Sequence, residues 1–146
     1  MPDVNTQILW PILSMMLLTL IVWVYMYVTR LGHIKSARID PQELTTAYRA
    51  AKHFPEHIAY PSENLRNLFE LPVLFYALCL YLYVTEAVDS LYLVLAWAFV
   101  VLRVVHSAIH CTINRVHWRF IAYMLSSTAL WVMLLRAVLQ LVRPAG

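Results

Sequence analysis

Four long apolar stretches separated by polar connections dominate the hydrophobic pattern of this chain. They run over residues 8–29, 67–84, 91–111 and 120–142. A helix needs about 20 apolar residues to cross the hydrocarbon core of a bilayer, and each stretch is close to that length. The pattern therefore predicts an all-α membrane protein, a four-transmembrane-helix bundle that forms one domain over residues 1–146.

The overall composition supports a membrane protein and excludes other classes. The chain is 62% hydrophobic and only 13% charged, whereas soluble domains carry about 25% charged residues. The net charge is +3, and the basic residues are scattered singly along the chain. Scattered basic residues and apolar spans together argue against nucleic-acid binding. The excess positive charge is better explained as a signal for membrane topology.

The connections between the stretches differ in length and charge. The first, residues 30–66, is long and polar, and prolines interrupt it. Within it, Asp40–Phe54 is compatible with a short amphipathic surface helix that starts at an Asp–Pro pair, a common N-cap and first-turn combination. The second connection, residues 85–90, is short and acidic, and the third, residues 112–119, is short and basic.

The distribution of basic residues predicts how the chain is oriented. Lys and Arg concentrate in the first and third connections, while residues 1–7 and the second connection contain none. By the positive-inside rule, the N-terminus lies outside and both basic connections lie in the cytoplasm; Arg143 is the exception. No positively charged segment or small-residue cleavage site accompanies the first stretch, so we expect it to remain in the mature protein.

The third stretch carries an unusual set of ionisable residues. Arg103, His106 and His110 are spaced i, i+3 and i+7 within an otherwise apolar helix. This spacing puts all three on one helical face. A charged side chain at membrane depth costs roughly 2.5–3.5 kcal/mol on insertion scales, and it is tolerated where it faces a protein interior or a wet cavity. An ionisable face within the membrane therefore marks a candidate functional site.

Polar residues of three stretches are expected at one membrane level. Asn67 and Glu70 open the second stretch, His110 is near the end of the third, and Arg119 and Tyr123 open the fourth. The predicted topology places all of these positions toward the cytoplasm. Such an arrangement is typical of a pocket rather than of scattered polar residues.

Each of these residues also has a purely structural interpretation. Glu70 could pair with Arg103 or Arg66 and so lock two helices together, and the histidines could hydrogen-bond within a polar helix interface. Two histidines at i, i+4 could alternatively bind a metal ion or a haem. Arg119 could anchor the helix end at the lipid headgroups, as interfacial arginines do.

The order and spacing of these motifs resemble the MAPEG family, the membrane-associated proteins of eicosanoid and glutathione metabolism. The motifs are RNLFELP (66–72), R-x-x-H-x-x-x-H (103–110) and an Arg–Tyr pair at i, i+4 (119 and 123). PSENLRNLFELPVLFYAL (61–78) is especially similar to the bacterial branch. The resemblance implies a four-helix bundle that assembles as a homotrimer and binds glutathione between subunits near the cytoplasmic side.

The resemblance also implies roles for individual residues. Arg119 matches an arginine that stabilises the glutathione thiolate, and Tyr123 matches its neighbour; these are the expected catalytic residues. The expected glutathione-binding residues are Arg38, Arg66, Asn67, Glu70, Arg103, His106 and His110, and no metal site is expected. The chain departs from the family at His110, where several members have tyrosine, and at Glu63, where they have arginine.

The resemblance, together with the predicted topology, implies a glutathione-dependent transferase or peroxidase-like protein of a bacterial inner membrane. Glutathione would be the co-substrate, and a lipophilic electrophile would reach the site from the surrounding lipids. The alternative is a non-enzymatic scaffold in which the same residues form a structural polar network. A metal or haem site is the third hypothesis.

Overall fold

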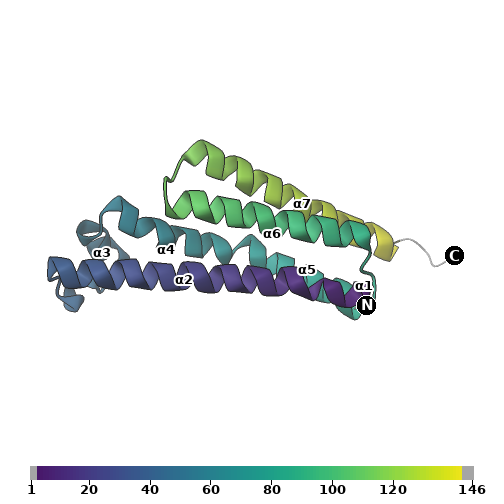
Figure 1. Ribbon diagram of the computed structural model, residues 1–146, viewed down its shortest axis with the longest axis horizontal. Helices are drawn as coiled ribbons and strands as arrows, with labels where there is room; N and C mark the ends of the chain where they lie inside the picture. The colour runs from purple at the N-terminus through teal and green to yellow at the C-terminus, as the bar shows by residue number, and fades with distance from the viewer. Residues whose placement is uncertain (1–2, 143–146) are drawn as a thin grey trace.

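Long helices running side by side make up the chain. A computed structural model describes residues 3–142, except for the side chain of Ala47. The helices are α1 (Val4–Gln7), α2 (Leu9–Ala37), η1 (Pro41–Leu44), α3 (Ala47–His53), α4 (Glu56–Leu68), α5 (Leu71–Val84), α6 (Ser90–Cys111) and α7 (Val116–Val142) (Figure 1). Four helical segments are long and apolar enough to span a membrane. The prediction of an all-α bundle with four spans is confirmed.

The first span is longer than its apolar stretch. Hydropathy alone ends it at residue 29, whereas α2 continues to Ala37. Polar residues end an apolar run without ending a helix, since Lys and Arg are good helix formers. The helix stops at Arg38, which adopts a left-handed conformation with φ 53° and donates its N–H to the carbonyl of Ile34. This is a common way for a helix to end.

The second span is two helices, α4 and α5, and it begins earlier than predicted. The polar connection was expected to reach residue 66, but α4 begins at Glu56. Phe69 and Glu70 interrupt the span, and Pro72 lies in the first turn of α5. A proline lacks the N–H that would continue the helix, and its ring clashes with the carbonyl four residues earlier, so it accounts for the break.

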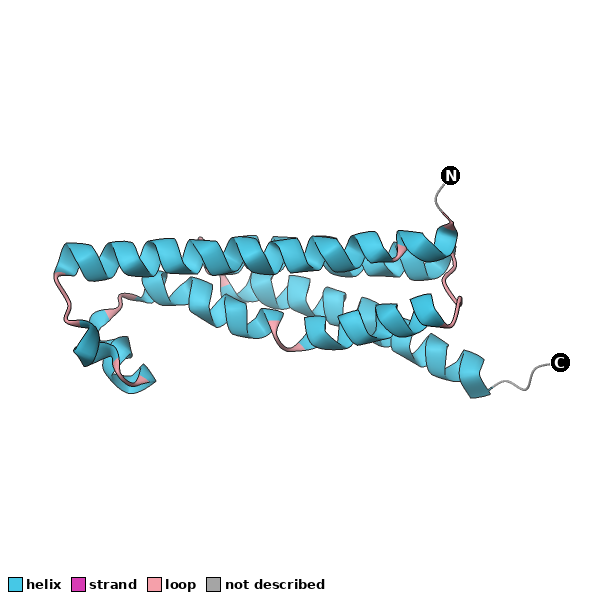
Figure 2. Cartoon of the chain, turned by 90° about the horizontal axis from the view of Figure 1, so that it is seen from below, coloured by secondary structure: helices cyan, strands magenta, loops and turns pink. Residues whose placement is uncertain are grey.

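Residues 38–55, here called the strap, connect the first span to the second. The strap contains η1 and α3 rather than the single surface helix expected over Asp40–Phe54. Asp40 caps η1 as predicted, accepting from the backbone N–H of Gln42 at 2.9 Å, and Thr46 caps α3 in the same way. The strap folds back against the end of α2 (Figure 2), where His33 Nε2 donates to the carbonyl of His53 at 3.0 Å.

The third and fourth spans, α6 and α7, form an antiparallel pair. Asn114 makes the tight connection between them with φ 44°, a conformation that asparagine tolerates better than most residues. Buried small residues on α7, including Ala122, Ser126 and Ser127, allow the two helices to approach closely. Because α7 begins at Val116 rather than at residue 120, Arg119 lies within the helix.

The core contains apolar side chains from all four spans. Phe75 of α5 stacks on Phe99 of α6 with ring centroids 4.4 Å apart, and Met15 of α2 and Met133 of α7 are fully buried around them. In each span, only 33–39% of the 18-residue apolar segment is buried inside the chain. The remaining apolar faces are exposed on the single chain, where an integral membrane protein can contact lipid.

An ion pair joins α6 to α7 at the end of the bundle near the N-terminus. Arg136 Nη1 donates to Asp89 Oδ1 at 2.8 Å, and a second hydrogen bond makes the pair bidentate. Asp89 also caps α6 by accepting from the N–H of Tyr92 at 3.0 Å. Hydrogen bonding to Arg136 holds the pKa of Asp89 well below its usual range, at about 2.

This ion pair should make stability depend on acid pH. A carboxylate whose folded pKa is depressed stabilises the fold above its unfolded pKa, about 3.9, and that contribution is lost as pH falls through the folded value. Asp89→Asn keeps the cap but removes the charge, and we expect it to lower stability by at most about 1 kcal/mol, because the pair is partly exposed. Thermal melting at neutral pH should show the difference, and it should disappear near pH 2. A difference that persists in acid would contradict this account.

Candidate functional site

The ionisable face of α6 points into the protein. Arg103 is fully buried, and His106 and His110 are each 3% exposed. The prediction that these three residues share an inward face is confirmed. They lie in the half of the bundle that contains the α6–α7 connection, together with Tyr123 from the second turn of α7.

The guanidinium of Arg103 is buried without a hydrogen bond of ordinary geometry among the described residues. Its carbon lies 4.6 Å from the ring centroid of Tyr123 and 5.3 Å from that of Phe99. Nε, Nη1 and Nη2 are all buried, and none makes a hydrogen bond of ordinary geometry in the described part of the chain, although the side chain of Tyr123 is close enough to interact with the guanidinium. A guanidinium carries five N–H donors, and leaving charged donors unpaired is costly. The aromatic rings offset only part of that cost. Arg103 is therefore suited to bind an anionic group brought by a ligand.

His106 is held in one orientation by the backbone of α7. Its Nδ1 lies 2.8 Å from the carbonyl oxygen of Arg119. Because a carbonyl only accepts, Nδ1 carries the proton, and Nε2 of the neutral ring is then an acceptor. Nε2 is buried and has no partner among the described residues. His106 thus offers a fixed acceptor beside the donors of Arg103 and the ring of Tyr123, whose centroid is 5.8 Å away.

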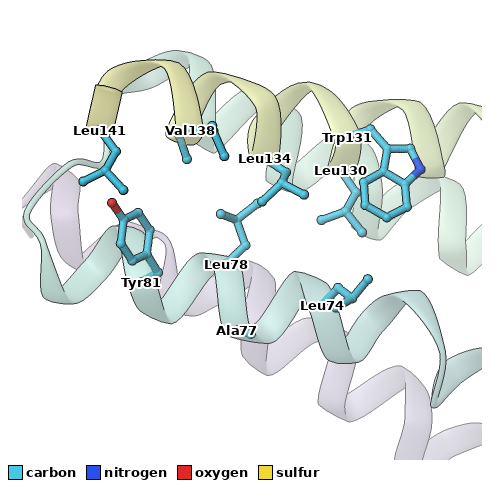
Figure 3. A pocket seen from close by; sticks show the side chains of 10 residues that line it. Leu74, Ala77, Leu78, Tyr81, Leu130, Trp131, Leu134, Val138 and Leu141 are labelled. Carbon is cyan, nitrogen blue, oxygen red and sulfur yellow. The ribbon is translucent and has the colours of Figure 1, made fainter. Parts of the chain in front are cut away.

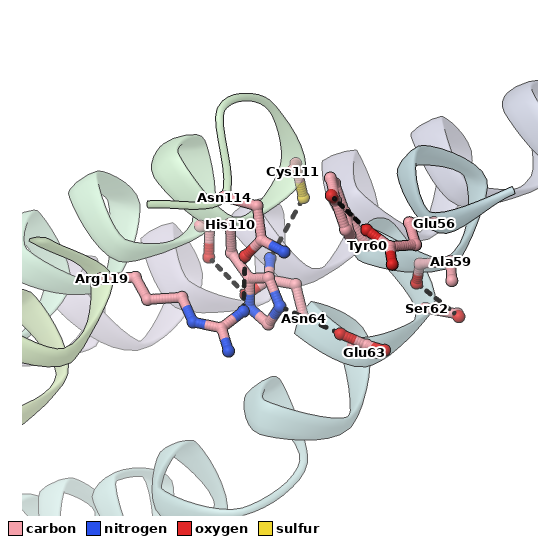
Figure 4. Close-up of polar contacts among 11 residues, drawn as sticks. Glu56, Ala59, Tyr60, Ser62, Glu63, Asn64, His110, Cys111, Asn114 and Arg119 are labelled. Carbon is pink, nitrogen blue, oxygen red and sulfur yellow. Dashed lines mark hydrogen bonds and ion pairs between the residues drawn. The ribbon is translucent and has the colours of Figure 1, made fainter. Parts of the chain in front are cut away.

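Arg119, His110 and Glu63 meet where α4 approaches the α6–α7 connection (Figure 4). Nη1 of Arg119 donates to the side-chain oxygen of Asn114, which orients the half-buried guanidinium. His110 Nε2 lies 3.5 Å from a carboxylate oxygen of Glu63, an ion-pair distance if the ring is protonated. Glu63 therefore interacts with His110, and these are the two positions at which the sequence differs from the motifs that it otherwise resembles.

Asn64 is a buried polar residue that the sequence analysis missed. It is fully buried, accepts from the hydroxyl of Ser107 at 3.4 Å, and donates to Sγ of Cys111 at 3.4 Å (Figure 4). It joins α4 to α6 next to the ionisable face. The sequence contained a signal for its burial, because Pro61, Asn64 and Leu68 are spaced i, i+3 and i+7 and so share one helical face. It was overlooked because the polar connection was expected to continue to residue 66.

Removing this amide should destabilise the bundle. In Asn64→Ala, the hydroxyl of Ser107 loses its acceptor in a buried position, so we expect a loss of roughly 1–2 kcal/mol in unfolding free energy. Thermal melting in detergent would measure it. The matched control is Asn67→Ala, which removes the same group from a half-buried position one turn away. An equal loss in both variants would show that Asn64 has no special role.

The four other expected site residues make no hydrogen bond, ion pair or ring contact with this cluster in the described part of the chain. Arg38 is exposed at the end of α2, Asn67 is half-buried near the end of α4, and Glu70 is exposed at the α4–α5 break. Arg66 is exposed and lines a different pocket, beside α2 and the strap. Among the expected site residues, hydrogen bonds, ring contacts and electrostatic interactions connect Arg103, His106, His110, Arg119 and Tyr123.

The expected ion pair of Glu70 is not formed. No salt bridge joins Glu70 to Arg103 or Arg66 among the described residues, although Glu70 attracts Arg103 electrostatically. The physical reason is the position of Glu70 at the helix break, where it serves as the residue before α5 and its side chain is exposed. The expectation that an ion pair of Glu70 with Arg103 or Arg66 locks two helices together is therefore wrong.

A metal site finds no support in the described part of the chain. No group of three or more His, Cys, Asp or Glu side chains there is arranged to hold an ion. The rings of His106 and His110 meet edge to face, with their centroids 5.5 Å apart.

An apolar groove lies between α5 and α7, in the half of the bundle away from the ionisable cluster (Figure 3). Its volume is about 340 Å³. The residues that line it are all aliphatic or aromatic: Leu74, Ala77, Leu78, Tyr81, Leu130, Trp131, Leu134, Ala137, Val138 and Leu141. Its chemistry suits a lipophilic molecule.

Comparison with known proteins gives one match. The family model described as MAPEG family matches residues 8–139, which include most of all four spans. No curated protein and no solved structure matches the chain.

Proposed function

Because the chain belongs to the MAPEG family, we propose that it is a glutathione-dependent transferase or peroxidase acting on lipophilic electrophiles. The observation that carries the proposal is the meeting of Arg103, His106, His110, Arg119 and Tyr123 at one level of the bundle, with the donors of Arg103 free to bind an anion. Glutathione supplies both features that such a cluster would recognise, carboxylates and a thiol.

Arg119 is the residue proposed to activate the thiol. A free thiol with a pKa near 8.5 is only a few per cent ionised at neutral pH, and the thiolate is the nucleophile. A guanidinium within hydrogen-bonding reach stabilises the anion, and each unit by which it lowers the pKa of the thiol corresponds to about 1.4 kcal/mol. Asn114 orients Arg119, which reduces the reorganisation needed when the thiolate forms.

The reaction is then a displacement or a reduction. In the transferase reaction, the thiolate sulfur attacks the electrophilic carbon, a C–S bond forms, and the leaving group departs with its electron pair. In the peroxidase reaction, two glutathione molecules reduce a lipid hydroperoxide to an alcohol and water and are oxidised to the disulfide. Tyr123, beside Arg103 and His106, would assist by hydrogen bonding to the sulfur.

The remaining contacts to glutathione are proposed to come from two sources. Within one chain, Arg103 would bind a carboxylate and His106 Nε2 would accept from an N–H or ammonium group. Arg38, Arg66, Asn67 and Glu70 lie outside the cluster, and their exposure is compatible with a site that a neighbouring subunit completes. This arrangement fits the proposed homotrimer.

The lipophilic substrate is proposed to enter from the bilayer. The apolar groove between α5 and α7 is lined by aliphatic and aromatic side chains and could hold its hydrocarbon part (Figure 3). We also propose that the protein resides in a bacterial inner membrane with the ionisable cluster toward the cytoplasm, because eight of the eleven Lys and Arg residues lie within residues 30–66 and 112–119.

Assays of the two enzymatic reactions test this proposal. Purified protein in detergent should conjugate glutathione to an activated aryl chloride, or reduce a lipid hydroperoxide, faster than the uncatalysed reaction, and the rate should saturate with glutathione. The absence of both activities in folded protein would favour the second candidate function.

That second candidate is a non-enzymatic scaffold. The observation in its favour is that Asn64, Ser107 and Cys111 form a hydrogen-bonded link between α4 and α6 that needs no ligand. In such a scaffold, replacing Arg119 would leave the fold intact and there would be no activity to lose.

A further inference from the structure

The ring of His110 lies where side chains of three helices meet, next to the arginine proposed to hold the thiolate. It is 3% exposed, and neither Nδ1 nor Nε2 makes a hydrogen bond of ordinary geometry within residues 3–142. Glu63 of α4 and Arg119 of α7 both act on the ring electrostatically, and Figure 4 shows it between these two side chains. His110 is therefore a buried, titratable group beside Arg119.

The proposed reaction needs an acceptor for the proton of the thiol. A guanidinium carries only donors and is not deprotonated in proteins, so Arg119 can stabilise a thiolate but cannot take up the proton that is released when the thiolate forms. Asn114 accepts a hydrogen bond from Arg119 and orients it, but an amide is not a base either. The proton must therefore go to another group near Arg119 or directly to water.

Glu63 gives the ring of His110 the polarity of a base. Nε2 of the ring lies 3.5 Å from Oε2 of Glu63. An ionised carboxylate only accepts hydrogen bonds, so in this pairing Nε2 of the neutral ring carries the proton and Nδ1 keeps its lone pair. A carboxylate behind a histidine also stabilises the imidazolium that forms when the free nitrogen takes up a proton. The separation is long for a hydrogen bond, as is common in catalytic sites before substrate binds.

Glu63 also connects the buried ring to water. Its side chain is 54% exposed, whereas that of His110 is 3% exposed. When Nδ1 takes up a proton, the proton on Nε2 faces the carboxylate and can leave on that side. The pair thus offers a path for protons from a buried position to the surface of the chain.

His106 is less suited to accept the proton. Its Nδ1 already donates to the carbonyl of Arg119 at 2.8 Å, so only Nε2 could accept. It makes no ion pair with a carboxylate in the described part of the chain, and Arg103 repels a positive charge on its ring. Protonating His106 would therefore add an uncompensated charge, whereas protonating His110 would add a charge next to Glu63.

We propose that His110 is the base that accepts the thiol proton of glutathione, and that Glu63 positions this base and relays the proton to water. The inference rests on the proposed function, because it assigns one step of the same reaction. The S–H bond breaks, its electron pair stays on the sulfur beside Arg119, and the proton bonds to Nδ1. A proton then leaves Nε2 through Glu63. The thiolate attacks the electrophile, and the released proton balances the leaving group in solution.

The test follows thiolate formation directly, without an electrophile. Detergent-solubilised protein is mixed rapidly with saturating glutathione, and the ultraviolet absorbance of the thiolate is recorded until equilibrium. His110→Gln keeps a polar side chain that cannot bind a proton, and it should slow thiolate formation about 100-fold, within the usual range for loss of a general base. The final amount of thiolate should be unchanged, because Arg119 sets it. In Arg119→Ala the final amount should fall instead.

The pH dependence of this rate separates a proton acceptor from a structural role. In the wild type, the rate of thiolate formation should change little around neutral pH. In His110→Gln, hydroxide must take the proton, so the rate should rise about tenfold for each pH unit. The charged and titratable groups that face His110 are Glu63 from α4, Arg119 from α7 and His106 from α6 itself. All three remain in this variant, so the changed pH dependence reports the loss of His110.

Glu63→Gln tests the proposal at an exposed position, where folding is not at risk, and it should slow thiolate formation about tenfold. Two matched controls should keep the wild-type rate. Glu56→Gln removes an exposed carboxylate two turns earlier on α4, and His117→Gln removes an exposed imidazole from α7.

Two failures are distinguishable in this experiment. A wild-type rate in folded His110→Gln or in Glu63→Gln, or an equal slowing in the controls, would overturn the assignment of the base, while the thiolate itself would still support the proposed function. If the wild type forms no thiolate at saturating glutathione, the proposed function is wrong and the assignment of the base is wrong with it.

Discussion

Replacing Arg119 with alanine should lower kcat/KM for glutathione conjugation by about 100-fold, the usual effect of removing one donor that stabilises a developing or bound anion. The thiolate loses the cation that stabilises it, so a smaller fraction of bound glutathione is nucleophilic at neutral pH. The rate should recover as pH rises toward the ordinary pKa of the thiol, about 8.5, because hydroxide then does what the guanidinium did.

The matched control for this variant is Arg115→Ala. Arg115 is exposed in the α6–α7 connection, one turn before Arg119 of α7, and its loss changes the net charge equally. Arg115→Ala should keep wild-type kcat/KM, and Arg119→Lys should recover part of the activity by restoring the charge without the paired donors. If Arg119→Ala is as active as the wild type at neutral pH, the assignment of the thiolate to Arg119 is wrong.

Replacing Arg103 with methionine should weaken glutathione binding without lowering the thermal stability of the protein. Its guanidinium is fully buried and makes no hydrogen bond of ordinary geometry among the described residues, so methionine removes an uncompensated charge and fills a similar volume. Buried ionic groups replaced by apolar residues of similar size often leave stability unchanged or raised. We therefore expect unchanged or higher thermal stability together with at least about tenfold weaker glutathione binding.

The outcome of Arg103→Met distinguishes the two candidate functions. A scaffold that uses Arg103 to hold its helices would melt at a much lower temperature without it. The conservative variant Arg103→Lys should bind glutathione better than Arg103→Met, because it keeps the positive charge. A large loss of thermal stability with unchanged glutathione binding would contradict the role given to Arg103 here.

The sequence predicted those features that depend on the spacing of apolar and ionisable residues. Four apolar stretches identified the four spans, and the i, i+3, i+7 spacing of Arg103, His106 and His110 predicted their shared buried face. Both features follow from helical geometry and the cost of exposing charge to lipid, so neither needs knowledge of the neighbouring helices.

Hydropathy was less informative where polar residues lie inside helices. It ended α2 before Arg30 and delayed the start of the second span to Asn67, so Asn64 was taken as part of a loop. The partners of polar residues were also unpredictable, because they depend on tertiary packing. Glu63 meets His110 and Glu70 makes no ion pair in the described chain, although Glu70 lies deeper in the second stretch.

A calorimetric titration of the detergent-solubilised protein with glutathione tests the proposed thiol site most directly. We expect saturable binding that is weakened in Arg103→Met and retained in Arg115→Ala. Folded, fully assembled protein that releases no saturable heat at millimolar glutathione would contradict it.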